Sequence, residues 1–298
     1  MICTLCGHRC GVDRAENETG FCTMGETAFL SKVMLHKWEE PCISGTNGSG
    51  AIFFTGCSLR CAFCQNWEIS HMRKGVAVDL DRLRDIFDEL ADQGAHNLNL
   101  VNPTHFVPFI AKAFSRYNKR IPVVYNTHGY DSLEALQRMD GIVDVYLPDL
   151  KYTYSLPARR YSAAPNYFEV AKAAIDEMFR QVGPVQYDEN GLLKKGVLIR
   201  HLILPGQTDS AKDVIDYVAE HFEKGSVLFS LMAQYIPCGD AVRYPEINRR
   251  LAQEEYDEVA QYLMDSPIEN GFFQELESAE EEYVPNFDLG GVLPPEER

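Results

Sequence analysis

The sequence lacks the features that place a chain in a membrane or on a nucleic acid. No apolar run reaches the 18 or more residues that a membrane-spanning helix needs. The first residues, MICTLCGHRC, do not have the charged-then-apolar layout of a signal peptide. Basic residues are scarce: 28 lysines and arginines against 44 aspartates and glutamates give a net charge of −16, whereas phosphate binding requires a basic surface. A cytoplasmic protein that binds neither nucleic acid nor membrane is predicted.

Two nucleotide-binding signatures are also missing. No G-x-G-x-x-G follows the first predicted strand, which argues against a dinucleotide-binding sheet. The segment GTNGSG at 45–50 lacks the G-K-[ST] of a P-loop and precedes a strand, so it is interpreted as a flexible approach to that strand. With 298 residues, the chain is long enough to bury a core without help from a metal.

Cysteine, in contrast, is abundant and unevenly distributed. Eight of the nine cysteines lie in the first 64 residues, which is not how the cysteines of a hydrophobic core scatter. In a cytoplasmic protein such clustering favours metal or redox chemistry over structural disulfides. Cys42 and Cys238 stand alone and are interpreted as small hydrophobic side chains. The other seven form two groups: Cys3, Cys6, Cys10 and Cys22, and then Cys57, Cys61 and Cys64.

Beyond residue 48, strand patterns alternate with helix patterns. The predicted strands are 51–56, 97–101, 122–126, 143–149, 196–204 and 226–232. The predicted helices between and after them are 78–94, 105–117, 132–139, 167–182 and 211–222. This alternation implies right-handed crossovers and a parallel sheet. A partial (β/α)6 barrel is favoured over a doubly wound sheet, and either fold places active-site groups at the C-terminal strand ends.

The chain is predicted to have three parts. Residues 1–48 form a Cys-rich N-terminal segment, and residues 49–236 form the partial barrel. Residues 237–298 contain one more helix, predicted at 246–264, and an acidic tail.

The segment GCSLRCAFCQN places three cysteines directly after the first predicted strand. Three thiolates can hold three irons of a [4Fe–4S] cube and leave the fourth iron open for a substrate or cofactor. A zinc site completed by another residue, a redox disulfide and plain core cysteines are the alternatives. The clustering favours an iron–sulfur cluster at Cys57, Cys61 and Cys64.

This C-x3-C-x-φ-C pattern, with Phe63 at φ, resembles the radical S-adenosylmethionine (SAM) superfamily. The segments CAFCQNWEIS, YLPDLKY and IRHLILPGQTDS are similar to segments of the activating enzymes for glycyl-radical enzymes. Together with the N-terminal cysteine motif, the linker WEEPCISGTNGSG and the segment SLMAQYIP, they resemble the pyruvate formate-lyase activating-enzyme-like subgroup.

The resemblance implies an enzyme in which SAM chelates the open iron through its amino and carboxylate groups. An electron from ferredoxin or flavodoxin then cleaves SAM to methionine and a 5′-deoxyadenosyl radical, which abstracts hydrogen. Followed literally, the hydrogen comes from a glycine of a partner glycyl-radical enzyme. A peptide or small-molecule substrate is the alternative within this class. A non-catalytic Fe–S electron carrier and a zinc-stapled binding module are the alternatives outside it.

The resemblance also assigns residues beyond the three cysteines. Phe63 is placed to contact the SAM adenine, and Asn126 is assigned to the cofactor. Asp149 and Lys151 lie where the activating enzymes contact SAM or substrate, and are the candidate catalytic residues. Arg200 is placed to meet the SAM carboxylate as a fork.

Two positions depart from the activating enzymes. The G-G-E that receives the SAM amino group is replaced by VNPTH at 101–105. Asn102 and Thr104 are the candidate acceptors, although as neutral groups they bind a cation more weakly than a carboxylate does. The alternative is that Thr104 only caps the next helix. Gln234 or Tyr235 stands where the activating enzymes commonly have histidine.

The first cysteine group supplies four thiolates without assistance. A closed zinc site or an auxiliary Fe–S cluster fits Cys3, Cys6, Cys10 and Cys22, and a structural metal is slightly favoured because the loop between them is polar. Free thiols are the third interpretation. His105, His128 and His201 lie at or near strand ends, where an acid–base role competes with the more common structural one.

Overall fold

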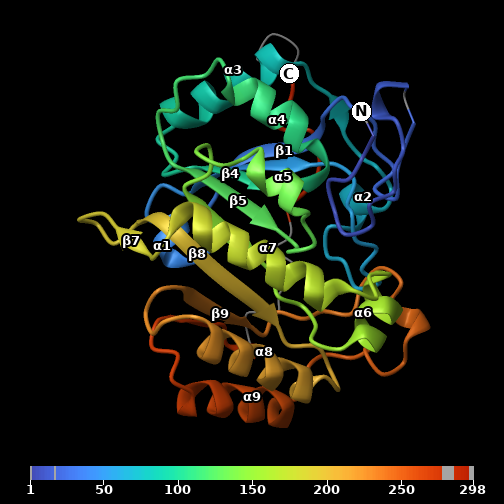
Figure 1. The fold of residues 1–298 in the computed structure, drawn as a ribbon, viewed down its shortest axis with the longest axis vertical. Helices are drawn as coiled ribbons and strands as arrows, with labels where there is room; N and C mark the ends of the chain where they lie inside the picture. The colour runs from blue at the N-terminus through green and yellow to red at the C-terminus, as the bar shows by residue number, and fades with distance from the viewer. Residues whose placement is uncertain (1, 17, 277–284, 295–298) are drawn as a thin grey trace.

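The computed structural model describes residues 2–16, 18–276 and 285–294 (Figure 1). One sheet runs in the order β10-β9-β8-β6-β5-β4-β2-β1-β3, and β7 pairs with β8. The strands are β1 Phe29–His36, β2 Ser49–Phe54, β3 Val76–Ala77, β4 Leu98–Val101, β5 Val123–Thr127, β6 Val145–Pro148, β7 Gln186–Tyr187, β8 Leu193–Leu202, β9 Leu228–Met232 and β10 Gly271–Phe273. The α-helices are α1 Pro41–Ser44, α2 Trp67–Ser70, α3 Leu80–Asp92, α4 Val107–Phe114, α5 Leu133–Gln137, α6 Ser155–Ser162, α7 Tyr167–Val182, α8 Thr208–His221 and α9 Gln253–Asp265.

The six predicted strands correspond to β2, β4, β5, β6, β8 and β9, and each pairs in parallel with its neighbour in the sheet. Every residue of β2, β5, β6 and β9 is buried, as expected of strands covered on both faces. The predicted α/β fold with a partial barrel is therefore confirmed. None of the helices in the described part of the chain is long and apolar enough to cross a membrane.

The sheet also contains strands that the sequence pattern did not reveal. β1 lies in the predicted N-terminal segment and pairs antiparallel with both β2 and β3. β10 lies in the predicted C-terminal part and extends the sheet in parallel beside β9. β10 at one end of the sheet and β1, next to the end strand β3, thus come from outside residues 49–236, and the three-part division stays a prediction.

Helix boundaries follow local capping. α3 begins at its N-cap Asp79, whose Oδ1 accepts a hydrogen bond of 2.8 Å from the backbone N–H of Arg82. α9 begins at Gln253, seven residues later than predicted, because the Glu255 side chain accepts from the N–H of Ala252 and sets the start there. α9 packs on α8, outside the sheet.

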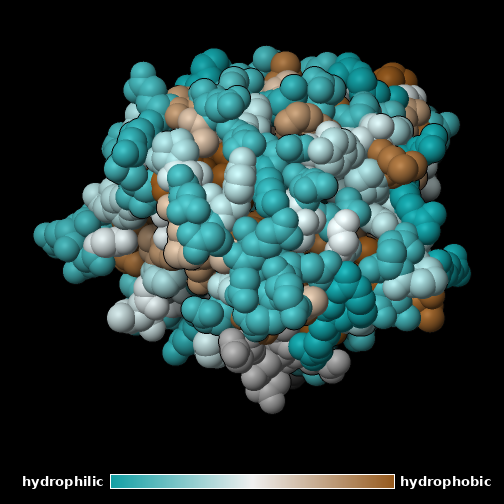
Figure 2. All heavy atoms as spheres, turned by 90° about the horizontal axis from the view of Figure 1, so that it is seen from below, coloured by the Kyte–Doolittle hydropathy of each residue, from teal (hydrophilic) through white to brown (hydrophobic). Residues whose placement is uncertain are grey.

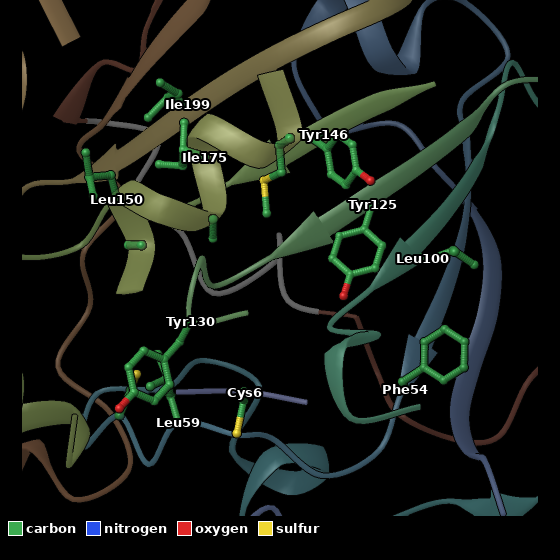
Figure 3. Packing of buried hydrophobic residues seen from close by; sticks show 14 of the residues in the cluster. Cys6, Phe54, Leu59, Leu100, Tyr125, Tyr130, Tyr146, Leu150, Ile175 and Ile199 are labelled. Atoms are coloured by element: carbon green, nitrogen blue, oxygen red, sulfur yellow. The ribbon is translucent and has the colours of Figure 1, made fainter. Parts of the chain in front are cut away.

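Side chains alternate along each strand between the helices and the barrel interior. Phe54, Leu100, Tyr125, Tyr146 and Ile199 belong to the main hydrophobic cluster, which includes the buried faces of the surrounding helices (Figure 3). A second cluster inside the barrel joins strand residues to α1, and consists of Cys42, Ile43, Val124, Val145, Leu147, Leu193, Leu198 and Leu228. The structural interpretation of Cys42 is therefore confirmed.

The two ends of the barrel differ. Strands β5 and β8 point toward the side on which the N-terminal segment, α2 and α6 lie, whereas α1 and β7 lie at the opposite end (Figure 1). The surface seen from below is covered mostly by hydrophilic side chains, as the acidic composition leads one to expect (Figure 2).

The tail returns to the sheet after residue 284. The backbone N–H of Val33 donates to the carbonyl of Gly290, and the N–H of Leu289 donates to that of Ser31. The Phe287 ring lies 5.5 Å from that of Phe53 on β2. This part of the predicted tail is therefore packed against β1 and β2.

Candidate active site

A cavity of about 440 Å³ lies inside the barrel. It is walled by the cysteine loop after β2, by the C-terminal parts of the parallel strands, and by the linker between β1 and α1. The residues assigned from the sequence that line it are Cys57, Cys61, Cys64, Asn102, Asn126, Asp149, Lys151 and Arg200. Phe63 and Thr104 do not line it.

The cysteine loop starts at a position that only glycine suits. Gly56 has a φ of +84°, and a Cβ there would lie 2.4 Å from the Met24 side chain. The loop then turns three thiols inward. Burial raises the pKa of Cys64 to about 12, and the nearby Cys61 thiol adds to this. Burial likewise raises the pKa of Cys57, with further contributions from Cys61 and Cys64. Thiols in this setting ionise when a metal supplies the opposing charge.

Each of the three sulfurs accepts a hydrogen bond. Ser162 Oγ lies 3.0 Å from Cys61 Sγ, and Tyr152 OH lies 2.7 Å from Ser162 Oγ. Ser70 Oγ lies 3.2 Å from Cys64 Sγ. The N–H of Leu59 donates to Cys57 Sγ over 3.3 Å. Donors of this kind stabilise thiolate sulfur and tune the potential of an Fe–S cluster.

Both kinds of metal group remain compatible with cysteine ligands. Across residues 2–16, 18–276 and 285–294, no group of three or more His, Cys, Asp or Glu side chains is arranged to hold a single metal ion. Zinc requires its ligands to meet at one point, whereas the cysteine ligands of a [4Fe–4S] cube bind different irons.

A buried ionic network stands beside the cysteines. Lys151 Nζ lies 2.6 Å from Asp149 Oδ2, and Arg200 Nε lies 3.2 Å from Asp149 Oδ1. Burial opposes the charge of Asp149, but Lys151 and Arg200 outweigh it and lower the pKa of this carboxyl. Burial also opposes the charge of Lys151, but Asp149 and the Cys61 thiol outweigh it and raise the pKa of the ammonium. Both groups are thus charged at neutral pH.

The sequence interpretation missed a member of this network. Glu39 comes from the linker WEEPC, and its Oε2 lies 3.0 Å from Arg200 Nη1. Its Oε1 accepts from Asn99 Nδ2 at 3.0 Å and from Asn126 Nδ2 at 3.1 Å. The adjacent Glu40 also lines the cavity. In the sequence, the two adjacent glutamates before Pro41 could have indicated that this linker contributes to the site. The linker was used there only as one of the motifs of the family resemblance.

The VNPTH segment brings one of its two candidates into the cavity. Asn102 has a φ of +58° and donates from Nδ2 to the carbonyl of Gly56 over 2.6 Å. Thr104 is fully buried, and its hydroxyl lies 3.4 Å from that of Thr127, outside the cavity. The capping role considered for Thr104 is wrong, because Pro103 occupies the N-cap of the short helix Thr104–Phe106.

Phe63 is directed away from the cavity. Its ring is buried and lies 5.6 Å from the ring of Tyr235. Its backbone oxygen accepts a hydrogen bond from Cys238 Sγ at 3.2 Å. An adenine contact by Phe63 stays a prediction. Gln234 lines the cavity, and its carbonyl accepts from Gln65 Nε2 at 3.1 Å.

The N-terminal cysteines form a second group. Cys3, Cys6 and Cys22 are buried and Cys10 is exposed. Burial raises the pKa of Cys6 to about 12, and the thiols of Cys22, Cys3 and Cys10 add to it, so all four lie within electrostatic reach of one another. Arg14 Nη2 lies 3.0 Å from Cys22 Sγ. The nature of any metal bound there stays a prediction.

The three histidines are neutral and tied to the backbone. His105 Nε2 bonds to the carbonyl of Thr55 at 2.8 Å, and His201 Nδ1 bonds to that of Leu150 at 2.6 Å, so these two have structural roles. His128 lines the cavity, and burial lowers its pKa to about 3. Its Nδ1 accepts from the N–H of Tyr130, which leaves Nε2 as the donor to Ser58 Oγ at 2.6 Å.

Comparison with known proteins agrees with this site. The family model of the radical SAM superfamily matches residues 51–218. The uncharacterized protein MJ0674 of Methanocaldococcus jannaschii is 34% identical over 266 residues, which cover 86% of this chain and 72% of that protein.

The similarity to solved structures is weaker. SuiB of Streptococcus suis bound to S-adenosylmethionine has a TM-score of 0.48 and 12% identity, over 76% of this chain and 50% of that one. HydG, a maturase of the [FeFe]-hydrogenase, has a TM-score of 0.47 and 12% identity, over 72% of this chain and 48% of that one. The chain spans about half the length of these two proteins. On its match to the family model and to the relative from Methanocaldococcus jannaschii, the chain belongs to the radical SAM superfamily, which implies an enzyme with a [4Fe–4S] cluster and S-adenosylmethionine.

Proposed function

We propose that Cys57, Cys61 and Cys64 hold the [4Fe–4S] cluster and that the chain uses it to cleave SAM reductively and abstract hydrogen from a substrate. The observation that carries this proposal is three thiols, buried at Cys61 and partly buried at Cys57 and Cys64. Each has a hydrogen-bond donor, and all three lie on the wall of a cavity that also holds charged side chains. When bound, such a cluster supplies the electron that splits SAM into methionine and a 5′-deoxyadenosyl radical.

The charged side chains are proposed to orient SAM and to balance the cluster. Arg200 has five N–H donors, and its three nitrogens are engaged by Asp149, Glu39 and Asn126. Two donors remain for the SAM carboxylate. Lys151, held by Asp149, places a buried positive charge near the Cys61 thiol and offsets the negative charge of the thiolates.

Asn102 is the proposed acceptor for the SAM amino group. It replaces the family's glutamate at the end of the second parallel strand, and its side chain bonds to Gly56 at the start of the cysteine loop. Asn126, on the next strand, is proposed to lie beside the cofactor, because its side chain is held there by hydrogen bonds to Glu39 and Arg200. Neutral acceptors bind an ammonium group less strongly than a carboxylate does.

The finer activity follows the sequence motifs. We propose an activating-enzyme-like oxidoreductase that receives electrons from ferredoxin or flavodoxin and removes hydrogen from a glycine of a partner protein. A peptide or small-molecule substrate is the second candidate. It is favoured by the cavity wall, part of which consists of the apolar residues Phe272, Phe273 and Pro285.

The N-terminal cysteines are proposed to hold a second metal group, either zinc or an auxiliary Fe–S cluster. Four thiolates leave no open iron, so this group would serve as a structural centre or an electron relay.

The test is anaerobic reconstitution with iron and sulfide, followed by SAM and dithionite. Formation of 5′-deoxyadenosine is expected, together with a change in the cluster's electron paramagnetic resonance spectrum on SAM binding. Cys61→Ala should abolish both. Failure of the intact chain to bind a cluster, or a bound cluster that leaves SAM uncleaved, contradicts the proposal. Deuterium transfer from a candidate substrate into 5′-deoxyadenosine identifies the hydrogen donor.

A further inference from the structure

In the part of the chain that the structure describes, the cavity region has unmet hydrogen-bonding capacity, which consists of four acceptor oxygens and one histidine nitrogen, His36 Nδ1. Among the described residues, four buried side-chain oxygens there have no hydrogen-bond partner: Glu40 Oε2, Asn99 Oδ1, Asn102 Oδ1 and Gln274 Oε1. Of these residues, all but Asn99 line the cavity, and Asn99 bonds to Glu39, which does. Every one of these atoms is an acceptor. A buried acceptor without a partner costs free energy, so the ligand that suits this cavity brings donors.

The unmet acceptors lie on different walls. Asn102 follows β4 and bonds to Gly56 of the cysteine loop, which places it at the SAM end of the cavity. Glu40 approaches Ser230 on β9, and the sheet order β9-β8-β6-β5-β4 separates that strand from β4. The one ammonium group of SAM cannot satisfy both acceptors, and its other donors, the adenine amino group and the ribose hydroxyls, carry no charge.

Glu40 also differs from the other carboxyl groups in the cavity. Asp149 is paired with Lys151 and Arg200, and Glu39 is paired with Arg200. Within the described ranges, no Lys, Arg or His nitrogen lies within 4.0 Å of the Glu40 carboxyl. Burial raises the pKa of this carboxyl, with Arg200 opposing and Glu39 reinforcing the shift, so the empty cavity disfavours its charge.

The net charge of the site with the cluster and SAM bound also favours a cationic ligand. A substrate cation beside Glu40 favours the ionised form of this carboxyl. With Glu40 ionised, Glu39, Glu40 and Asp149 contribute three negative charges and Lys151 and Arg200 two positive ones. An oxidised cluster on three thiolates adds about one negative charge, and SAM adds about one positive charge. The site keeps about one negative charge when both are bound, and a substrate with one positive charge neutralises it.

We propose that Glu40 binds a cationic N–H group of the substrate, a primary ammonium or a guanidinium. This rests on the proposed function, and it defines a substrate class: a small molecule or peptide side chain that carries such a group. The same chemistry is present in the SAM ammonium, so the experiment must separate these two sources.

The test uses the reconstituted holoenzyme and Glu40→Gln, which removes the charge and keeps the size of the side chain. Calorimetry measures the binding of n-pentylammonium and, as its uncharged match, 1-pentanol, in the presence of SAM. The intact holoenzyme is expected to bind the ammonium at least tenfold more tightly than the alcohol, and E40Q to lose that preference. Glu269→Gln removes one charge from an exposed ion pair with Lys224 and is the control.

The effect of E40Q on SAM affinity, measured by titration of the cluster spectrum, shows whether Glu40 binds the substrate cation or the SAM ammonium. The proposal expects E40Q to change it less than twofold. A tenfold loss of SAM affinity in E40Q, with amine binding unchanged, assigns Glu40 to the SAM ammonium and overturns the proposal. Equal binding of pentanol and pentylammonium by the intact holoenzyme overturns it as well.

Two further measurements test whether the charge of Glu40 is the cause of the preference. Glu40→Asp keeps the charge and is expected to retain part of the preference, so loss in E40Q but not in E40D identifies charge rather than misfolding as the cause. Failure of the proposed function is recognised separately, because a protein that binds the amine through Glu40 but forms no 5′-deoxyadenosine contradicts SAM cleavage and not the cation site.

Discussion

Arg200 Nη1 lies 3.0 Å from Glu39 Oε2, so a side chain of β8 meets the linker that precedes the first parallel strand inside the barrel. Only 13% and 11% of the two side chains are exposed. Asp149 and Asn126 also bond to the guanidinium, and Asn99 and Asn126 bond to the glutamate. Removal of one partner therefore leaves a largely buried charge with weaker compensation.

Double-mutant cycles on this pair are expected to show strong coupling. Glu39→Gln and Arg200→Met should each lower the free energy of unfolding in urea by about 2–3 kcal/mol, and the double variant by about 1–2 kcal/mol less than the sum. The exposed pair Lys224–Glu269 is the control, with coupling of at most about 0.5 kcal/mol. Additive effects at Glu39 and Arg200 contradict the buried-pair interpretation.

Ser162 is expected to tune the cluster. Its hydroxyl lies 3.0 Å from Cys61 Sγ and also bonds to Tyr152 OH. Ser162→Ala removes a donor worth about 1 kcal/mol, which corresponds to about 40 mV for one electron. Because the sulfur then donates more charge to iron, the reduction potential of the cluster should fall by that amount.

Redox titration monitored by electron paramagnetic resonance measures this shift. Ser226→Ala is the control, because that hydroxyl donates to the carbonyl of Glu223 and contacts no sulfur. An unchanged potential in S162A, in a protein that still binds its full complement of iron, excludes the hydrogen bond as a tuning element.

How far the sequence predicts this molecule depends on how much apolar surface each element buries. The parallel strands were recognisable because both faces are covered, which produces continuous apolar runs such as AIFF in β2. β1 reads FLSKVMLH, and its half-buried pattern is interrupted where the register shifts between Leu30 and Lys32. β10 has three residues and no periodicity to detect.

The missed part of the site follows from the missed strand. β1 and β2 pair antiparallel, with His36 at the end of β1 opposite Ser49 at the start of β2. The linker that joins these two ends places Glu39 and Glu40 on the wall of the cavity. Motif comparison located the charged residues at strand ends because parallel strands collect them at one edge. It could not show that Phe63 and Thr104 face away, since side-chain direction depends on packing with Tyr235 and Thr127.

The two cysteine groups should respond separately to mutation. Cys6→Ala is expected to release any metal bound by the N-terminal group and to leave about four irons bound after reconstitution, because the proposed cube depends only on Cys57, Cys61 and Cys64. Cys61→Ala is expected to lose that iron and retain the N-terminal metal. Elemental analysis of both proteins measures this and shows whether the first group holds zinc or iron. Loss of all metal in both variants contradicts two independent sites.

The Glu255 carboxylate should stabilise the fold in a pH-dependent way. It accepts from Arg249 Nη1 at 2.7 Å, from the N–H of Gly206 at 2.7 Å and from that of Ala252 at 3.0 Å. The bond from Arg249 comes first among the causes that lower the pKa of Glu255 to about 2. A lowered folded-state pKa stabilises the protein above the unfolded value, and this contribution is lost as pH falls toward the folded value.

Glu255→Gln is therefore expected to lower the free energy of unfolding by about 1 kcal/mol at pH 7, since solvent screens an ion pair near the surface. The difference from the intact protein should shrink by about half or more between pH 6 and pH 3, where the unfolded chain takes up the proton first. Urea unfolding at both pH values measures it. Glu254→Gln removes a neighbouring acid of the first turn of α9 and should change stability by less than about 0.5 kcal/mol. A destabilisation by E255Q that stays constant down to pH 3 indicates that lost helix capping, and not the charge, is the cause.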